Sequence, residues 1–352
     1  MLLLLWLSQT SSQLISKFHT AGEIPQVKLV FRLNCVCLRN ELMLKPSPRS
    51  PFHKIFVRLS SYMTSLESNH NFYQLTPVQL GCEVRGIDLK KDVPKEVISA
   101  IKEDVTKHRI LIFKDQGVVS GPRHVEIGKW FGEPESTFYK HPRSPHPDVF
   151  RVSNDRSEGC TNVGRTGWHI DGSFQEAPFG YAVYHMVNVP TYGPTVFAPL
   201  TDIVEGLPRE QRIRWERLYM VSDRRSGPIH PLIYSHPLTK KKVLCFHLGM
   251  TDSFVWDHNT SEARHTDDDE TYQILREIHH EFVKNNKAIQ YSHEWKVGDF
   301  IISDNLSVGH EAAPETQLPR SQVGLRVLHR VTTVGHCPPA KEYNYREELG
   351  LE

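Results

Sequence analysis

An imidazole and a carboxylate stand two residues apart in the segment 167–174, at His169 and Asp171. In an extended backbone successive side chains point to opposite faces, so these two would share one face, and Trp168 and Ile170 would occupy the other. A histidine and a carboxylate side by side supply two of the three ligands of a 2-His-1-carboxylate iron site. The chemistry of the segment therefore depends on whether a second histidine can join it.

The His-x-Asp spacing occurs three times in this chain, so the spacing alone is a weak signal. The copy at His146 has Pro147 at its centre, which is unfavourable inside a sheet. The copy at His265 leads into an acidic run that suits the first turn of a helix. Only the copy at His169 lies among apolar and aromatic residues, and a purely structural hydrogen bond between His169 and Asp171 remains its alternative.

A candidate for the third ligand is His310, near the end of the chain. It follows an apolar strand predicted over residues 299–303 and the polar pair Asp304 and Asn305. Such a strand could carry the histidine to the interior that His169 faces. The combination predicts an iron site formed by residues far apart in the sequence.

Two arginines share one face of a strand predicted over residues 324–334, at Arg326 and Arg330, with Leu328 between them. They would lie about 13 Å apart at ~3.3 Å per residue. A guanidinium directed into a sheet-lined interior is costly unless an anion meets it. The pattern predicts two anionic groups at different depths, or one anion and one buried carboxylate. Two arginines on an exposed strand edge are the alternative.

The elements that must position these residues are short strands with a few amphipathic helices. Helices are predicted over residues 94–108, 122–131, 208–220 and 268–285. Strands are predicted over residues 72–76, 82–89, 110–113, 149–152, 181–189, 232–235, 242–247, 289–295, 299–303 and 324–334. This order favours a mainly β fold with flanking helices and a double-sheet jelly-roll core, that is, a cupin-like double-stranded β-helix.

The composition is that of an ordinary soluble globular protein, with 39% hydrophobic and 24% charged residues in a chain of 352. A formal net charge of +1 gives no reason to expect nucleic acid or an anionic membrane as a partner. No apolar run reaches the roughly 18 residues of a membrane span. Six scattered cysteines indicate reduced, intracellular thiols. We expect a small-molecule substrate, and a homo-oligomer stays open.

Residues 1–70 form a basic leader that contains serine and proline, and residues 71–345 form the domain with the candidate site. Between Lys17 and Arg58 the leader has eight Lys and Arg but only Glu23 and Glu41 as acids. This composition is typical of a mitochondrial transit peptide; a signal peptide and a simple extension are the alternatives. The expected location is cytoplasmic or mitochondrial.

Between about residues 72 and 338 the chain resembles the taurine dioxygenase (TauD/TfdA) family of Fe(II)- and 2-oxoglutarate-dependent dioxygenases. The resemblance rests on residues 168–171 and 193–197, on Asp304 and Asn305 followed by His310, and on Arg326 with Arg330. It implies an oxidoreductase that uses Fe(II), with 2-oxoglutarate and O2 as cosubstrates.

The resemblance also implies individual roles for the candidate residues. His169, Asp171 and His310 would be the iron ligands, and Thr195 with Arg326 would hold the distal carboxylate of 2-oxoglutarate. A facial triad of this kind leaves open positions on the iron for the 2-oxo acid and for O2. A planar guanidinium suits bidentate recognition of a carboxylate.

For the substrate, the resemblance implies that Arg330 lies near both the iron-bound end of 2-oxoglutarate and an anionic group of the substrate. His141 takes the position where sulfonate-using members place a histidine. Arg165 stands just before the Trp-His motif, where taurine-specific members have asparagine, and its charge would repel an ammonium group. The predicted reaction is hydroxylation of a small sulfonate- or carboxylate-bearing substrate, with release of succinate and CO2.

Three alternatives remain at this stage. A hydroxylase of a cationic amino-acid derivative, like the carnitine-pathway enzymes, would need acidic or aromatic residues around its substrate. A zinc-type hydrolase would use the same three ligands to activate water but would give no role to Thr195 and Arg326. A non-catalytic jelly-roll protein would tolerate the loss of the ligands.

Overall fold

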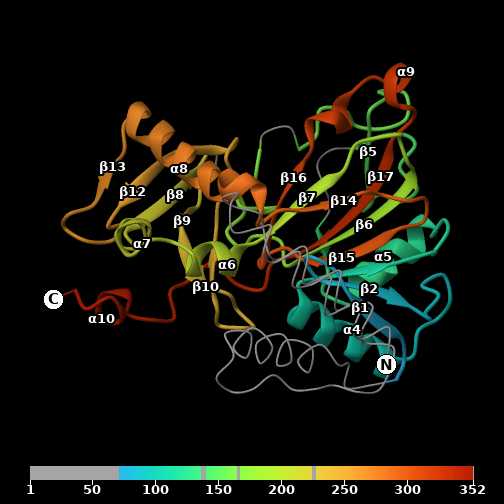
Figure 1. Ribbon diagram of the computed structural model, residues 1–352, viewed down its shortest axis with the longest axis horizontal. Helices are drawn as coiled ribbons and strands as arrows, with labels where there is room; N and C mark the ends of the chain where they lie inside the picture. Colours follow the sequence, from blue (N-terminus) through green and yellow to red (C-terminus); the bar gives the residue numbers. More distant parts are fainter. Residues whose placement is uncertain (1–70, 136–139, 165–166, 224–226, 352) are drawn as a thin grey trace, which may run out of the picture. The chain divides into compact units, whose positions relative to one another are not determined.

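The computed structural model describes residues 71–135, 140–164, 167–223 and 227–351 (Figure 1). The predicted leader, residues 1–70, lies outside these ranges and its role stays a prediction. Within the ranges described, no helix combines the length and the apolar character that a membrane crossing requires.

The largest sheet has eight strands and provides one wall of the core. Its strand order is β1-β2-β3-β15-β6-β17-β4, and β5 pairs with β17 as well. The strands are β1 (Gln74–Pro77), β2 (Cys82–Arg85), β3 (Ile110–Phe113), β4 (Pro134–Glu135), β5 (Phe150–Ser153), β6 (Tyr181–Asn188), β15 (Phe300–Asp304) and β17 (Val327–Thr333).

A second sheet of three strands provides the opposite wall (Figure 1). Its order is β14-β7-β16, with β14 (Tyr291–His293), β7 (Thr195–Pro199) and β16 (Val308–Ala312). Apolar side chains from both sheets, among them Met186, Phe197 and Leu328, form one buried cluster. The two sheets therefore face each other, as in a jelly roll.

The central strands of the large sheet are buried on both faces, which explains their nearly continuous apolar sequences. Alternate residues of β3, such as Ile110 and Ile112, join the cluster between the sheets. The residues between them, such as Leu111, pack under the helices α4 (Lys95–His108) and α5 (Gly121–Lys129). The outer face is thus covered by helices, and the inner face is free to build a cavity.

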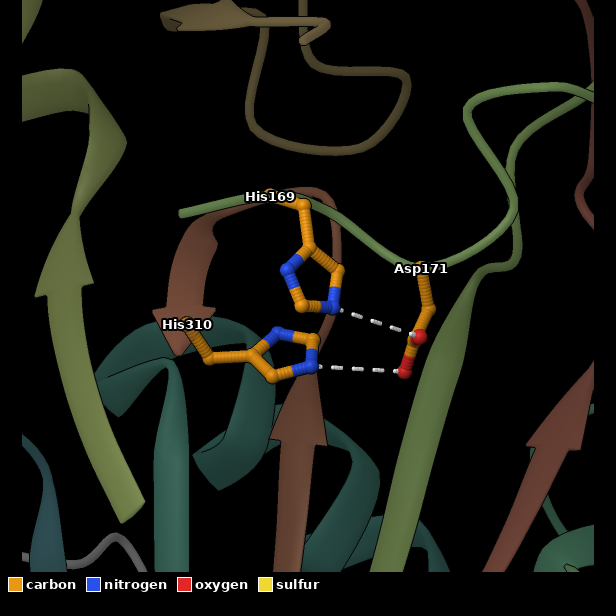
Figure 2. Close-up of side chains that lie close together, drawn as sticks. All are labelled: His169, Asp171 and His310. Atoms are coloured by element: carbon orange, nitrogen blue, oxygen red, sulfur yellow. Dashed lines mark ion pairs between the residues drawn. The ribbon is translucent and has the colours of Figure 1, made fainter. Parts of the chain in front are cut away.

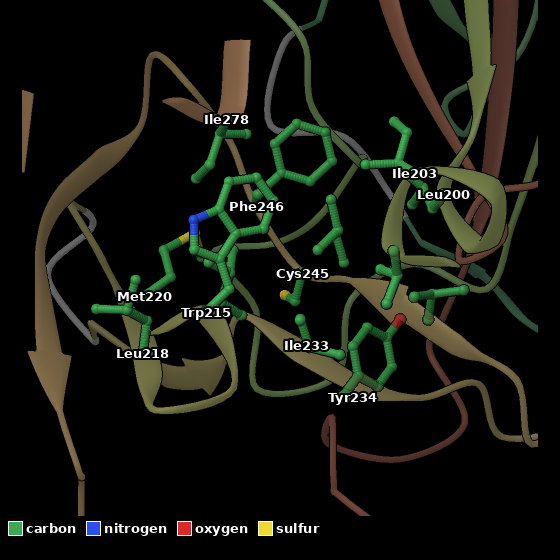
Figure 3. Close-up of a cluster of buried hydrophobic side chains, with 14 of the residues drawn as sticks. Leu200, Ile203, Trp215, Leu218, Met220, Ile233, Tyr234, Cys245, Phe246 and Ile278 are labelled. Carbon is green, nitrogen blue, oxygen red and sulfur yellow. The ribbon is translucent and has the colours of Figure 1, made fainter. Parts of the chain in front are cut away.

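The segment between β7 and β14 adds a smaller α/β unit to this core. It has a four-stranded sheet of order β13-β12-β8-β9 and a two-stranded sheet of β10 and β11. Its apolar core is built around large side chains such as Trp215 and Phe246 (Figure 3). Its elements are α6 (Leu200–Glu205), α7 (Arg209–Glu216), β8 (Leu218–Ser222), β9 (Ile229–Pro231), β10 (Ile233–Ser235), β11 (Lys242–Leu244), β12 (Thr251–Trp256), β13 (Arg264–His265) and α8 (Asp268–Lys287).

Most predicted elements of the two-sheet core are confirmed within a few residues. The helix predicted over residues 208–220 is wrong beyond Glu216, because Leu218–Ser222 pairs as β8 with β12. Strands β4, β9, β12, β13 and β16 were not predicted. The chain described ends with η1 (Pro314–Gln317), α9 (Arg320–Val323), β17 and α10 (Tyr345–Glu348).

Three histidines lie close together between α5 and the outer face of the large sheet. His185 and His329 are cross-strand partners with ring centroids 6.5 Å apart, and His124 on α5 lies 6.1 Å from His185. Burial lowers the pKa of all three, to about 3 for His329. The folded protein therefore keeps these imidazoles neutral.

We expect the free energy of unfolding to fall as the pH drops below 6.5, the ordinary pKa of histidine. Below pH 6.5 the histidines of the unfolded chain take up protons, whereas the buried rings of the folded protein do not. The stability that is present above pH 6.5 is therefore lost as the pH falls toward the lower pKa values of the folded state. Each buried ring should lower the free energy of unfolding by about 1 kcal/mol over the first pH unit below 6.5. Urea denaturation across pH should show a shallower dependence for His124→Gln, and an unchanged one for the exposed His279→Gln. Equal pH slopes in wild type and His124→Gln would contradict this explanation.

Candidate metal centre and its cavity

The segment with His169 lies beside the edge strand β16 of the small sheet. The amide of His169 donates to the carbonyl of His310 at 3.1 Å, and the amide of His310 donates back at 2.9 Å. Trp168 and Ile170 point away into the core of the inserted unit, where Trp168 stacks on Phe282 at 4.5 Å. The predicted alternation of faces is confirmed. The segment is not a full strand, however, because only His169 forms β-bridges and the chain turns from Asp171 onward.

The side chains of His169, Asp171 and His310 point toward one another (Figure 2). Their candidate ligand atoms all lie within 4.8 Å of one another, and all three residues are buried. Nε2 of His169 lies 3.9 Å from Oδ1 of Asp171, and Nε2 of His310 lies 3.5 Å from Oδ2. No other trio of His, Cys, Asp and Glu in the described ranges has this geometry, so the copies at His146 and His265 are not part of such a cluster.

The protonation of this trio suits a divalent metal. Nδ1–H of His169 donates to the carbonyl of Gly167 at 2.7 Å, which leaves the lone pair on Nε2, the nitrogen that faces Asp171. Burial lowers the pKa of His169, and burial with the neighbouring His169 lowers that of His310 to about 3. Burial alone would raise the pKa of Asp171, but Arg330 and the histidines bring it to about 2. Two neutral imidazoles and one carboxylate are the forms that bind metal.

A cavity of about 290 Å³ opens beside the trio, between the two sheets. Leu328, Arg330 and Thr332 of β17 line it, as does Arg326, which directly precedes the strand, so the predicted alternation is confirmed. Arg326 is 3% exposed, which rules out the exposed-edge alternative for this arginine. Burial lowers its pKa to about 10, and its guanidinium remains charged at neutral pH.

The inner part of this cavity fits a carboxylate. Nε of Arg326 is buried without a hydrogen-bond partner, and within the described ranges no carboxylate forms an ion pair with this guanidinium. Thr195 lines the same cavity, and its Oγ1 accepts a hydrogen bond from Nε1 of Trp295 at 3.0 Å. The hydroxyl proton of Thr195 is thus available for an acceptor such as a carboxylate oxygen.

Arg330 lies beside the metal trio. Its Nη1 donates to Oδ1 and Oδ2 of Asp171 at 2.7 and 2.8 Å, and its guanidinium lies 5.1 Å from the ring of Phe150. In the part of the chain that the structure describes, its buried Nε has no hydrogen-bond partner, and the same holds for Nε of Arg326. The cavity therefore presents two guanidinium groups that each have donor capacity left.

Of the two remaining predicted substrate residues, only His141 belongs to the described residues, and it is not brought to the cavity. His141 is not among the residues that line it. Its Nδ1 accepts from the amide of Arg143, and its Nε2 lies 3.2 Å from the carbonyl of Arg156, so both ring nitrogens have partners within this loop. Arg165 lies outside the described residues, and its role stays a prediction.

A third histidine, His247, lies next to the trio and was not predicted. It forms a backbone bridge with His169, and the two rings stack at 4.5 Å with an angle of 21°. The register places five rings in one row across the strands: Tyr291, Phe197, His310, His169 and His247. No short motif marks His247, because its position depends on pairing with a segment 78 residues away.

Asn305 joins the two segments that provide the trio. Its Oδ1 accepts from the amide of Asp171 at 2.9 Å, and its Nδ2 donates to the carbonyls of Asp171 and Phe179 at 2.9 and 2.7 Å. Asn305 belongs to the turn between β15 and β16, and β16 contains His310. The sequence pattern singled out this asparagine without indicating what it contacts.

Replacing Asn305 with alanine should weaken Fe(II) binding by roughly 10- to 100-fold, the usual cost of losing a residue that holds a metal ligand in place. Asn305→Asp should not restore binding, because a carboxylate cannot donate to the two carbonyls. Anaerobic metal titration measures the affinity, and thermal melts establish that each variant folds. The exposed Asn259→Ala is the matched control. Wild-type affinity in Asn305→Ala would show that the amide does not position Asp171.

Comparison with known proteins identifies the family. Residues 71–332 match the family described as taurine catabolism dioxygenase TauD, TfdA family. The chain belongs to this family. It is a 2-oxoglutarate-dependent dioxygenase whose cofactor is Fe(II) and whose cosubstrates are 2-oxoglutarate and O2.

Relatives with assigned activities are distant. An alpha-ketoglutarate-dependent sulfonate dioxygenase of Saccharomyces cerevisiae is 24% identical over 78% of this chain and 72% of its own length. An alpha-ketoglutarate-dependent sulfate ester dioxygenase of Pseudomonas putida is 21% identical over 74% of this chain and 88% of its own. A 2,4-dichlorophenoxyacetate dioxygenase of Cupriavidus pinatubonensis is 24% identical over 71% and 93%. At this identity they do not determine the substrate.

Solved structures confirm the predicted jelly-roll fold. A putative taurine dioxygenase from Burkholderia xenovorans superposes with a TM-score of 0.62 at 23% identity, over 76% of this chain and 94% of that one. The protein AAD-2, solved in complex with Mn(II) and N-oxalylglycine, gives a TM-score of 0.60 at 20% identity, over 76% and 98%.

In this dioxygenase the bound cofactor would supply the oxidation, coupling decarboxylation of 2-oxoglutarate to hydroxylation of a C–H bond. The side chains described here have other tasks. His169, Asp171 and His310 offer three lone-pair donors from one side, and Arg326 with Thr195 offers donors to a carboxylate. Two packed sheets around the cavity limit the access of water to the reacting groups.

Proposed function

We propose that this dioxygenase hydroxylates a small organic anion that carries a sulfonate, sulfate or carboxylate group, with release of succinate and CO2. His169, Asp171 and His310 are its iron ligands. The observation that carries the proposal is the pair of guanidinium groups that line the cavity of the trio, those of Arg326 and Arg330. Their buried Nε atoms have no hydrogen-bond partner among the described residues.

The two arginines take different anions. Arg326 and Thr195 bind the distal carboxylate of 2-oxoglutarate, since Arg326 is the more buried and forms no ion pair with a described carboxylate. Arg330 neutralises Asp171 through Nη1 and has its other nitrogens left for the anionic group of the substrate. A buried guanidinium with unused donors favours an anion over a neutral group.

The rest of the cavity suits an apolar substrate body. Its walls include the side chains of Phe150, Val163, Phe174, Phe179 and Met250. The relatives named for sulfonates, sulfate esters and dichlorophenoxyacetate all act on organic anions, and this supports the same class here. An alkyl or aryl group joined to one anionic head matches both the walls and the arginines.

Succinate release with a panel of substrates tests the proposal. Alkyl sulfonates, alkyl sulfates and aryloxy carboxylates of matched length should stimulate succinate release above the substrate-free rate, and quaternary ammonium betaines should not. Arg330→Lys should raise the KM of the anions more than that of 2-oxoglutarate, because lysine cannot reproduce the forked donors. A flat response to every anion, with activity on betaines, would overturn the anionic assignment.

One observation favours the second candidate, a hydroxylase of a cationic amino-acid derivative. Apart from Asp171, Glu135 is the only carboxylate among the described residues that line the cavity, and it pairs with Thr332 on β17. A carboxylate in the cavity wall would attract the positive charge of such a substrate. Glu135→Gln separates the two candidates: it should leave turnover of anions intact but reduce turnover of a cationic substrate.

A further inference from the structure

Tyr184 on β6 places a phenol hydroxyl directly beside the metal trio. Its Oη lies 3.4 Å from Nε2 of His310, and the residue is 3% exposed. It lines the cavity, and its cross-strand partner on β17 is Arg330. Its ring packs edge-on against Phe197 and His310, with centroids 6.2 and 6.0 Å apart. These contacts fix the direction of the hydroxyl.

The hydrogen bond to His310 cannot persist once a metal is bound. A neutral imidazole has one lone pair, and Nε2 of His310 faces Asp171 as a ligand of the trio. The metal takes that lone pair, so the hydroxyl of Tyr184 needs another acceptor, because a buried hydroxyl without one is costly. The Tyr184 hydroxyl can also reach Asp171. Both oxygens of that carboxylate already accept from Arg330, and one is needed by the metal, so Asp171 has little acceptor capacity left for a further donor.

We infer that the Tyr184 hydroxyl donates its hydrogen bond to an oxygen atom at the metal-bound end of 2-oxoglutarate. Tyr184 is then a cosubstrate-binding residue that acts at the opposite end of the molecule from Arg326 and Thr195. This inference rests on the proposed iron ligands and is independent of the substrate. Phenylalanine would fill the same space between Phe197 and Arg330, so replacing Tyr184 with phenylalanine removes only the hydroxyl.

Tyr184→Phe in the full chain tests the inference. Under anaerobic conditions Fe(II) alone should bind to the variant as it binds to wild type, because the three ligands are intact. The dissociation constant of 2-oxoglutarate, followed by the visible charge-transfer band of the Fe(II) complex, should rise roughly three- to tenfold, as for one hydrogen bond to a charged acceptor. The band should also shift in energy, which a loss of packing would not cause.

Tyr234→Phe is the matched control, because Tyr234 is similarly buried and belongs to the core of the inserted unit. Its hydroxyl has no hydrogen-bond partner among the residues described. It should leave the binding of 2-oxoglutarate unchanged. The inference would be overturned if Tyr184→Phe had the wild-type dissociation constant for 2-oxoglutarate and an unshifted charge-transfer band. Weaker binding of Fe(II) in the absence of 2-oxoglutarate would overturn it too, since the hydroxyl would then act on the ligands. If the proposed iron ligands were wrong, the outcome would be distinguishable, because the wild-type protein would then show no charge-transfer band.

Discussion

Replacing His310 with alanine should abolish the visible band that Fe(II) and 2-oxoglutarate produce together, and with it all 2-oxoglutarate-dependent turnover. Two ligands would remain, both from the segment 169–171, and β16 would no longer offer an imidazole to the metal. The loss of Fe(II) affinity should exceed the roughly 10- to 100-fold cost of removing a residue that only holds a ligand in place, because this substitution removes a ligand itself. The variant should still fold, since the backbone bonds between His169 and residue 310 do not involve the side chain.

The matched control for this experiment is His247→Ala. His247 lies in the same row of rings and stacks on His169, but it is not one of the three residues whose ligand atoms converge. This variant should retain the band, whereas His310→Ala should not. The assignment of His310 as a ligand would be wrong if its alanine variant kept the band, or if both variants lost it equally while remaining folded.

Replacing Arg326 with methionine should weaken the binding of 2-oxoglutarate by roughly 100-fold or more. Removal of one partner from a buried ion pair costs about 3–5 kcal/mol, and each 1.36 kcal/mol is a factor of ten. Titration of 2-oxoglutarate into the anaerobic Fe(II) protein measures the change. The exposed Arg320→Met, on the nearby helix α9, should leave the constant unchanged.

The same substitution should stabilise the protein when 2-oxoglutarate is absent. Arg326 is then a buried cation with no ion-pair partner among the described residues, and burial lowers its pKa to about 10. An apolar side chain of similar length removes this desolvation cost, and comparable replacements gain about 1–4 kcal/mol. Thermal melts should show a higher midpoint for Arg326→Met without 2-oxoglutarate, and a rise on its addition only for wild type. Binding within a few-fold of wild type would exclude Arg326 from the cosubstrate site.

The parts of the site that the sequence predicts are those that depend on local periodicity. Alternation along one segment was enough to direct Arg326, just before β17, and Arg330 on β17 to the cavity, and His329 to the opposite face. The same alternation directed His169 and Asp171 away from the core of the inserted unit. The order of the strands was sufficient for the jelly-roll prediction.

The parts that were not predicted depend on which distant segments meet. His247, Asn305 and Tyr184 contact the trio through pairings over 78 to 134 residues, and no local pattern encodes those registers. The helix predicted through residue 220 failed for a related reason. Leu218 and Met220 alternate into the core because β12 offers them a partner, which a helical reading of the segment cannot include.

The bonds between the two ligand-bearing segments have a consequence for how the protein acquires its metal. Reciprocal backbone bonds between His169 and His310, and the amide of Asn305 on Asp171, hold the trio together without any ion. Binding of Fe(II) therefore orders little chain, and the entropy of joining residues 134 to 141 positions apart is already lost on folding. Such a preorganised pocket should exchange its metal reversibly in the native state, so that a chelator inactivates the protein without denaturing it.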